Sequence, residues 1–307
     1  MQFIKNYFLV IVLFALIGFF SVQTNNFFSV ITLSTMLSQL PALTFVAVGM
    51  TLVLIVGGID LSVGSLMALS SAIIGVLIVQ SGFSFQFAVI CALLLTMMFG
   101  CINGALSSWM KLPSFIVTLG MLEAARGLSY VVSDSQTLYV GASVQGLTDP
   151  IAGIGISVMM LLAFSVVIIG HVLLNYTVFG KHLIAIGSNK KAAVMSGIRP
   201  NPNILIVFVI SAFLAALAGL ANLSYLGSSD PNAGLGLELS AIAAAVIGGT
   251  SLMGGRGTVL GTFVGVLIIA VLNSGLAQMG VSEPSKRIIT GVVIVLAVLL
   301  DKWRANN

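Results

Sequence analysis

Long apolar runs, separated by short polar or glycine-rich breaks, follow one another along nearly the whole chain. The runs lack the two-residue alternation of polar and apolar positions that marks lipid-facing strands, so they predict helices rather than a barrel. At about 20 residues per crossing, 307 residues allow roughly ten spans joined by short loops. The pattern therefore predicts an all-α polytopic membrane protein, with about ten transmembrane helices and roughly eight as the lower bound, in one transmembrane domain over residues 1–307.

The apolar runs also place the individual spans. In chain order we expect them at about 7–20, 42–56, 61–79, 85–106, 113–132, 154–174, 204–221, 237–247, 258–278 and 288–300. The run 27–56 is too long for one plain span and contains Pro41, so we expect a broken or interfacial piece and then a span with Pro41 in its first turn. The run 237–247 is too short to cross a bilayer at about 1.5 Å per residue, which predicts a half-helix or an oblique segment.

The charges in the loops predict which side of the membrane each loop occupies. The one long polar interruption, Gly180–Pro202, holds four of the twelve basic residues and no acidic residue. By the positive-inside rule this segment is cytoplasmic. Lys5 and the basic C-terminal stretch 301–304 place both termini on the same side, whereas the loops 133–153 and 222–236 carry acidic residues only and suit the outer face.

Composition narrows the class of protein without adding a partner. With 59% apolar and only 7% charged residues, the chain cannot present a soluble surface, and its net charge of +4 follows from topology, so no nucleic acid is implied. Lys286 and Arg287 are exceptions on the outer side, where Glu283 is the expected partner. The cysteines Cys91 and Cys101 fall within one span and read as small core residues. The first apolar segment is expected to be a retained span, because no convincing signal-cleavage sequence follows it.

Three charged residues in or beside the predicted spans are candidates for a functional role. Asp60 follows a glycine pair at the break before the third span, where it either caps that span or faces a substrate path. Glu123 and Arg126 are three residues apart on one helix face and can form an internal ion pair. Such a pair is a functional candidate, although its simplest role is to hold the fifth span against a neighbour.

Small residues repeat at helical spacing in two places and predict close helix packing. The two stripes are Ser211, Ala215 and Gly219, and Gly257, Gly261 and Gly265. A weaker pattern relates residues 57–78 to 248–268, with glycines and a GVLI stretch at nearly equal offsets. This echo indicates either two halves built from one unit or a chance match between glycine-rich apolar segments.

The sequence indicates a transporter that receives energy from another protein. It holds no Ser/His/Asp set, paired carboxylates or metal-ligand cluster, and Gly180-Lys181 is followed by His182, so the phosphate-binding loop of an ATPase is absent. The few intramembrane charges give little support to an ion relay. Within Gly180–Pro202, the Ala- and Lys-rich stretch 189–196 predicts a short exposed helix with Ser188 or Asn189 as its N-cap and Gly197 as its stop. We interpret it as a contact for a separate energy-supplying protein.

Three separated motifs resemble the ribose-type permease subunits of bacterial ATP-driven (ABC) importers. They are GIDLSVGSLMAL near the start, AIGSNKKAAVMSGI in the basic segment and LELSAIAAAVIGGTSLMGGRGTVLGTFVGVLI near the end. The resemblance covers nearly the whole chain. It implies that the basic segment, about 180–202, is the coupling loop of a permease domain that contacts an ATPase. The matching residues are Ala185, Gly187, Asn189, Ala192, Ala193, Gly197 and Ile198. We expect this Ala-rich helix to present no bulky exposed side chains.

The resemblance also implies partners and a location. It implies an ATP-binding subunit that carries ATP and Mg²⁺, an extracytoplasmic sugar-binding protein, and a second permease copy, identical or not, within the lipid of the bacterial inner membrane. The chain itself is expected to be no enzyme and to hold no cofactor or metal. A sugar route needs hydrogen-bonding side chains, and the amides nearest the span ends are Asn103, Asn222, Asn273 and Gln278.

The sequence therefore predicts a permease that imports a monosaccharide, ribose-like, by alternating access. Two alternatives stay open. One is a permease for another small solute, such as a branched-chain amino acid, and the other is a secondary carrier that needs no ATPase.

Overall fold

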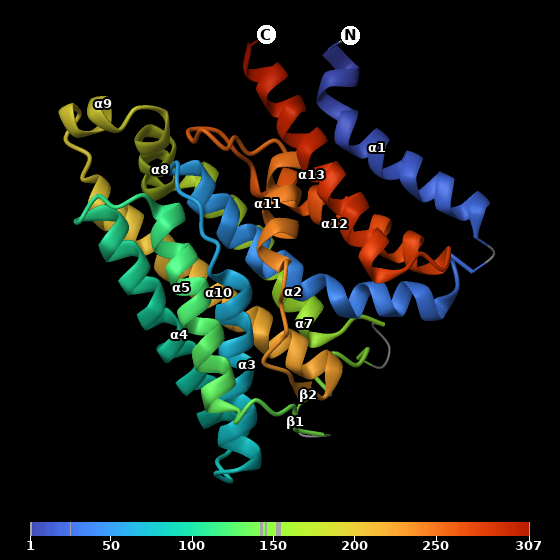
Figure 1. Cartoon of the computed structure of the whole chain (residues 1–307). Coiled ribbons are helices and arrows are strands. Elements are labelled where there is room, and N and C mark those ends of the chain that lie inside the picture. The colour runs from blue at the N-terminus through green and yellow to red at the C-terminus, as the bar shows by residue number, and fades with distance from the viewer. Residues whose placement is uncertain (1, 25, 142–143, 145, 152–154, 307) are drawn as a thin grey trace.

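The computed structural model describes residues 2–24, 26–141, 144, 146–151 and 155–306 (Figure 1). Helices make up most of this part of the chain. They are α1 (Gln2–Gln23), α2 (Val30–Ile55), α3 (Val63–Val79), α4 (Phe85–Ser108), α5 (Ser114–Val132), α7 (Val158–Tyr176), α8 (Val178–Ser188), α9 (Lys190–Met195), α10 (Pro200–Leu226), α11 (Leu237–Ile247), α12 (Val259–Gln278) and α13 (Glu283–Asn306). Strands β1 (Leu138–Tyr139) and β2 (Ser228–Ser229) pair antiparallel.

Each predicted span falls on one helix, and most helix ends lie within one or two turns of the predicted ends. The predicted start of the sixth span, Ile154, lies outside the described residues. Within the described part, six helices are long and apolar enough to cross a bilayer, namely α2, α4, α5, α7, α10 and α12. Shorter apolar helices occur at Leu9–Gln23, α3 and α11. An all-α polytopic membrane protein is confirmed, while the count of about ten spans stays a prediction.

Helix α2 corrects one prediction. The run that contains Pro41 was expected to break, but the helix continues from Val30 to Ile55 with Pro41 in its interior. A proline inside a helix removes one backbone hydrogen bond and costs about 3 kcal/mol. Here Leu40 and Pro41 are both buried, and α2 packs against α7, α10, α11 and α12. Burial of this central helix outweighs the cost of its proline.

Both predicted stripes of small residues lie where helices approach closely. On α10, Ala215 is fully buried, and a Cβ atom at Gly219 would overlap the carbonyl oxygen of Met67 on α3. On α12, a Cβ atom at Gly265 would overlap the carbonyl oxygen of Ala244 on α11. The glycines therefore set the distance between the helix axes in these two pairs.

The two ends of the helical bundle carry different features. Figure 1 shows α9, the N-terminal end of α1 and the C-terminal end of α13 toward one end of the molecule. Strands β1 and β2 lie toward the opposite end. The predicted topology requires the same grouping, and which end faces the cytoplasm stays a prediction. In that topology the basic segment and both termini share one side, and the acidic loops that hold β1 and β2 share the other.

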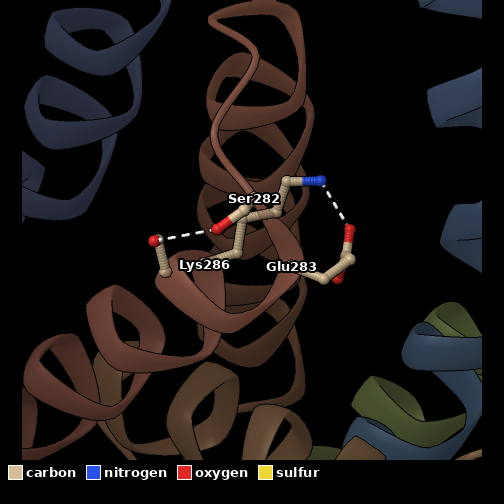
Figure 2. Close-up of polar contacts among 4 residues, drawn as sticks. Ser282, Glu283 and Lys286 are labelled. Carbon is tan, nitrogen blue, oxygen red and sulfur yellow. Dashed lines mark hydrogen bonds and ion pairs between the residues drawn. The ribbon is translucent and has the colours of Figure 1, made fainter.

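The expected partner of Lys286 is confirmed at the start of α13. Lys286 Nζ donates to Glu283 Oε1 at 2.6 Å, and the hydroxyls of Ser282 and Ser285 lie 3.0 Å apart (Figure 2). The pair neutralises one of the two basic residues that depart from the positive-inside pattern.

Candidate functional site

The basic segment Gly180–Pro202 holds most of α8, the whole of α9 and the start of α10. The sequence predicted the helix at α9 and missed α8. α9 begins where predicted, with Asn189 rather than Ser188 as its cap, because Asn189 Oδ1 accepts a hydrogen bond from Ala192 N at 3.0 Å. Gly197, at φ +83°, ends the turn, as expected. Thr177 caps the preceding α8, accepting a hydrogen bond from Gly180 N at 3.2 Å.

The end of α8 is wedged between two distant parts of the chain. A Cβ atom at Gly187 would overlap the carbonyl oxygen of Ile55, the last residue of α2, and the amide of Gly255. Gly255 N in turn donates to Ile55 O at 2.9 Å, and Ser188 lies against Gly255. Two of the three motifs, those that hold Gly187 and Gly255, therefore meet at the end of α2, just before the first motif begins at Gly58.

The exposed face of α9 differs from the expectation of small side chains only. Ala193 is 4% exposed and anchors the helix to the core, but Met195 is 89% exposed and Val194 also faces outward. The prediction of no bulky exposed side chains is wrong, because the six-residue helix turns Ala193 inward and leaves the larger residues outside. Met195 thus places an exposed, flexible apolar side chain on an otherwise polar segment.

The remaining residues of the predicted coupling set divide between core and surface. Ala185 and Ile198 are half-buried and pack on the core, whereas Ala192 is exposed. Ile198 N donates to Ala193 O at 3.0 Å, which fixes the chain after Gly197. The segment thus combines an anchored inner face with a free outer face.

Asp60 forms the centre of a buried polar cluster. Its Oδ1 accepts from Ser62 N at 3.0 Å and from Ser62 Oγ at 2.6 Å, and its Oδ2 accepts from Ser211 Oγ on α10 at 2.9 Å. Asn103 Nδ2 on α4 donates to Ser62 Oγ at 3.0 Å. Asp60 therefore stabilises the loop before α3 and joins it to α10 instead of capping the free amides of α3, whose N-cap residue is Ser62.

Arg126 does not form the ion pair expected with Glu123. Glu123 is exposed, and within the described residues the pair makes no salt bridge. Arg126, 9% exposed, instead donates from Nη1 to Pro231 O at 2.5 Å and to Ala233 O at 2.8 Å. The carboxylate of Glu238 lies close enough to act on the guanidinium electrostatically. The physical reason is burial, since the loop before α11 offers Arg126 two carbonyl oxygens inside the protein.

The loop held by Arg126 leads into the half-helix α11. Tyr130 Oη donates to Asn232 Oδ1 at 2.5 Å, one helical turn from Arg126 on α5. At Gly64, near the start of α3, a Cβ atom would overlap Gly234 O and the carboxylate of Glu238. This packing holds the N-terminal end of α11, and the C-terminal end of α11 runs into the loop that touches α8.

The other amides are not brought together. Asn222 Oδ1 is buried on α10 without a hydrogen-bond partner among the described residues. Asn273 is exposed on α12. Gln278 Nε2 donates to Thr32 Oγ1 at 2.8 Å and joins the end of α12 to the start of α2. Of these amides, only Asn103 joins the Asp60 cluster. The sequence analysis did not identify Ser62 and Ser211 as partners of Asp60, and it included Ser211 only in a stripe of small residues.

Comparisons with known proteins agree with the geometry. A family model described as branched-chain amino acid transport system / permease component matches residues 32–298. The ribose import permease protein RbsC of Bacillus subtilis (strain 168) is 40% identical over 298 residues, 95% of this chain and 91% of the relative. The fructose import permease protein FrcC of Rhizobium meliloti is 34% identical, covering 96% of this chain and 84% of the relative. The D-allose transport system permease protein AlsC of Escherichia coli (strain K12) is 35% identical, covering 96% and 90%. No solved structure matches the chain significantly.

Proposed function

This chain belongs to the family described as branched-chain amino acid transport system / permease component, and we propose that it is the permease subunit of an ATP-driven importer for a monosaccharide. The proposed solute is ribose or a ribose-like sugar, moved across the bacterial inner membrane by alternating access. The named relatives import ribose, fructose and allose, and the ribose permease of Bacillus subtilis shares 40% identity with this chain. The proposed partners are an ATP-binding subunit, an extracytoplasmic sugar-binding protein and a second permease copy.

The observation that carries the coupling role is the position of α8 and α9. Gly187 at the end of α8 contacts the end of α2 and the loop after α11, whereas α9 presents Met195 to the outside. A partner that grips α9 from the cytoplasm therefore acts on two long segments of the bundle through rigid contacts. Rigid-body displacement of a packed unit is one of the established forms of a switching transition.

Helix α11 connects the two ends of the proposed mechanism. Its inner end continues into the loop that touches α8, and its outer end follows the loop held by Arg126. Movement imposed at the cytoplasmic side is therefore transmitted by an eleven-residue rigid element to the outer loop. We infer that the outer loop opens and closes with the ATPase cycle, and that Arg126 stabilises its closed form.

A second solute class has support in the name of the family model, which refers to branched-chain amino acids. The sugar names of the relatives favour a monosaccharide, because they come from longer, specific matches along nearly the whole chain. Competition between labelled ribose and unlabelled leucine for uptake into liposomes distinguishes the two classes.

Reconstituted transport tests the proposed function. The chain is placed in liposomes with and without its candidate ATPase and binding protein, and uptake of labelled ribose is measured. Uptake is expected only with both partners and ATP. Gradient-driven uptake by the chain alone would establish a secondary carrier and reject the importer, and leucine-specific uptake would reject the sugar.

The variant Met195→Glu tests the coupling surface. It places a charge where an exposed apolar contact is proposed, and we expect at least about a tenfold loss of ATPase co-purification with unchanged folding. The matched control is Met253→Glu, because Met253 is 86% exposed in the loop after α11 and lies outside α9. An equal effect of both variants would show that α9 is not the specific contact.

A further inference from the structure

A groove of about 560 Å³ lies beside α9, where α4 ends and α10 begins. Its walls come from the α4–α5 turn, from α9 and from the start of α10. Because α4, α5 and α10 are candidate membrane spans that end here, the groove lies at the level where spans leave the bilayer. Trp109, 52% exposed, lines it. Tryptophan is enriched at this level, where its ring meets the lipid headgroups.

The groove is basic. Lys111, Lys190 and Arg199 line it, and no carboxylate does. Where the structure describes the chain, the one ion pair formed by a lysine or arginine is that of Lys286 on α13, so these three cations are not neutralised by the protein. Lys111 is held at φ +56°, a conformation that costs a side chain about 1–2 kcal/mol and that glycine adopts freely. The turn thus keeps a cation at a position where glycine would be less strained.

A second groove, of about 550 Å³, lies further along α10 and is apolar where the first is basic. It lies between α7 and α10 and is lined by apolar residues except for one threonine. Pro202 lines the basic groove, and Ile206 and Ile210, spaced four and eight residues further along α10, line the apolar one. Residues at this spacing share one helix face. A basic headgroup-level groove is therefore aligned with an apolar groove within the spans.

We propose that these two grooves hold one anionic phospholipid. Its phosphate lies among Lys111, Lys190 and Arg199, and one acyl chain runs along Ile206 and Ile210. Basic pockets between spans on the cytoplasmic side bind anionic lipid headgroups by charge, and the apolar groove supplies the surface that a free anion would not use. Lys190 belongs to α9, so the lipid braces the helix proposed to receive the ATPase. The lipid site extends beyond the permease function and does not depend on the identity of the solute.

Adjacent lysines provide the sharpest test. Lys190 lines the groove, whereas Lys191, the next residue of the same exposed helix, does not. The full chain is purified in detergent, and binding of phosphatidylglycerol and of phosphatidylcholine is titrated by native mass spectrometry. Since one cation near an anionic lipid contributes about 1 kcal/mol, Lys190→Gln is expected to weaken phosphatidylglycerol binding about fivefold. Lys191→Gln and phosphatidylcholine binding are expected to change less than about twofold.

Two further variants test the headgroup position and the acyl-chain position separately. Lys190→Arg keeps the charge and is expected to retain phosphatidylglycerol binding, which excludes a folding defect. Ile206→Trp fills the apolar groove and is expected to weaken phosphatidylglycerol binding as well, and an unchanged titration would overturn the proposed acyl-chain position.

Three outcomes would overturn the lipid site itself. One is an equal loss of phosphatidylglycerol binding in Lys190→Gln and Lys191→Gln, which indicates diffuse attraction. Another is stabilisation of the chain by inorganic phosphate as strong as that by phosphatidylglycerol. The third is weaker ATPase co-purification of Lys190→Gln with unchanged lipid binding, which identifies the groove as a protein contact. The titration uses the chain alone, so its failure leaves the transport test of the proposed function unaffected.

Discussion

At the scale of single residues, Gly187 shows how a missing side chain can hold distant segments together. A Cβ atom at Gly187 would overlap the carbonyl oxygen of Ile55 and the amide nitrogen of Gly255, so only glycine fits there. Substitution to alanine forces α8 away from the end of α2. We expect Gly187→Ala to destabilise the protein by about 1–3 kcal/mol and to uncouple ATP hydrolysis from uptake.

The measurements for Gly187→Ala are thermal unfolding of the purified chain and ribose uptake in liposomes. Gly120→Ala on α5 is the control, since a Cβ atom there meets nothing within 4 Å. Alanine at Gly120 is expected to be neutral or to stabilise the helix by up to about 1 kcal/mol. Normal uptake by Gly187→Ala would show that the contact at α8 is not needed for coupling.

Arg126 is the second residue whose partners carry a prediction. Replacement by methionine leaves the carbonyl oxygens of Pro231 and Ala233 without their donor. A buried group left unpaired costs about 1–3 kcal/mol, so Arg126→Met is expected to lower stability by that amount and to loosen the loop before α11. Hydrogen exchange of residues 230–236 measures the loosening.

Glu123→Gln is the control for Arg126→Met. Because Glu123 is exposed and makes no salt bridge with Arg126 among the described residues, its neutralisation is expected to change stability by less than about 0.5 kcal/mol. Equal destabilisation by both variants would instead support the Glu123–Arg126 ion pair that the sequence suggested.

The residue-scale partners show what the sequence could not supply. Spacing along one helix placed Glu123 and Arg126 on a common face, but the partner of Arg126 lies 105 residues away in sequence. The same holds for Asp60, whose contact with Ser211 joins the loop before α3 to α10. Pairings over such separations depend on how the helices pack, and a single sequence carries no direct signal for them.

At the scale of elements, the length of apolar runs was a reliable guide. It placed a helix at each predicted span and identified 237–247 as too short to cross a bilayer, as α11 is. α8 was missed because its polar and glycine residues resemble a loop, and its helix forms through the Thr177 cap and burial of Leu183 and Ile186. At Pro41 the sequence predicted a break where the helix continues. Local propensity disfavours proline inside a helix, but the burial of α2 overrides it.

The cap of α9 gives a prediction at this scale. Asn189→Ala removes the side-chain acceptor for Ala192 N and is expected to destabilise the short helix by about 1 kcal/mol. Because α9 has only six residues, this loss frays the helix without unfolding the bundle. We expect weaker ATPase co-purification and an unchanged melting temperature of the chain.

Asn189→Asp is the matched variant, because aspartate caps as well as asparagine. It is expected to retain ATPase co-purification. Equal loss in both variants would show that the amide group itself is recognised, and loss in neither would show that the order of α9 does not matter for coupling.

At the scale of the whole molecule, the topology predicts which residues can be reached from each side. Helix α9 and strand β1 lie toward opposite ends of the bundle (Figure 1). Met195 on α9 and Tyr139 on β1 are both strongly exposed. With the native Cys91 and Cys101 replaced by serine, Met195→Cys is expected to react with a membrane-impermeant maleimide only in inside-out vesicles. Tyr139→Cys is expected to react only in right-side-out vesicles, and labelling from the same side would contradict the topology.

The short helix α11 has a mechanical consequence for the molecule as a whole. Eleven residues form a rod about 16 Å long, and glycines in left-handed conformation flank it at Gly236 and Gly249. With its outer end held, a shift of about 2 Å at its inner end tilts such a rod by about 7°. α11 therefore has the proportions of a lever arm with a glycine turn at each end, which turns a small displacement into a rotation.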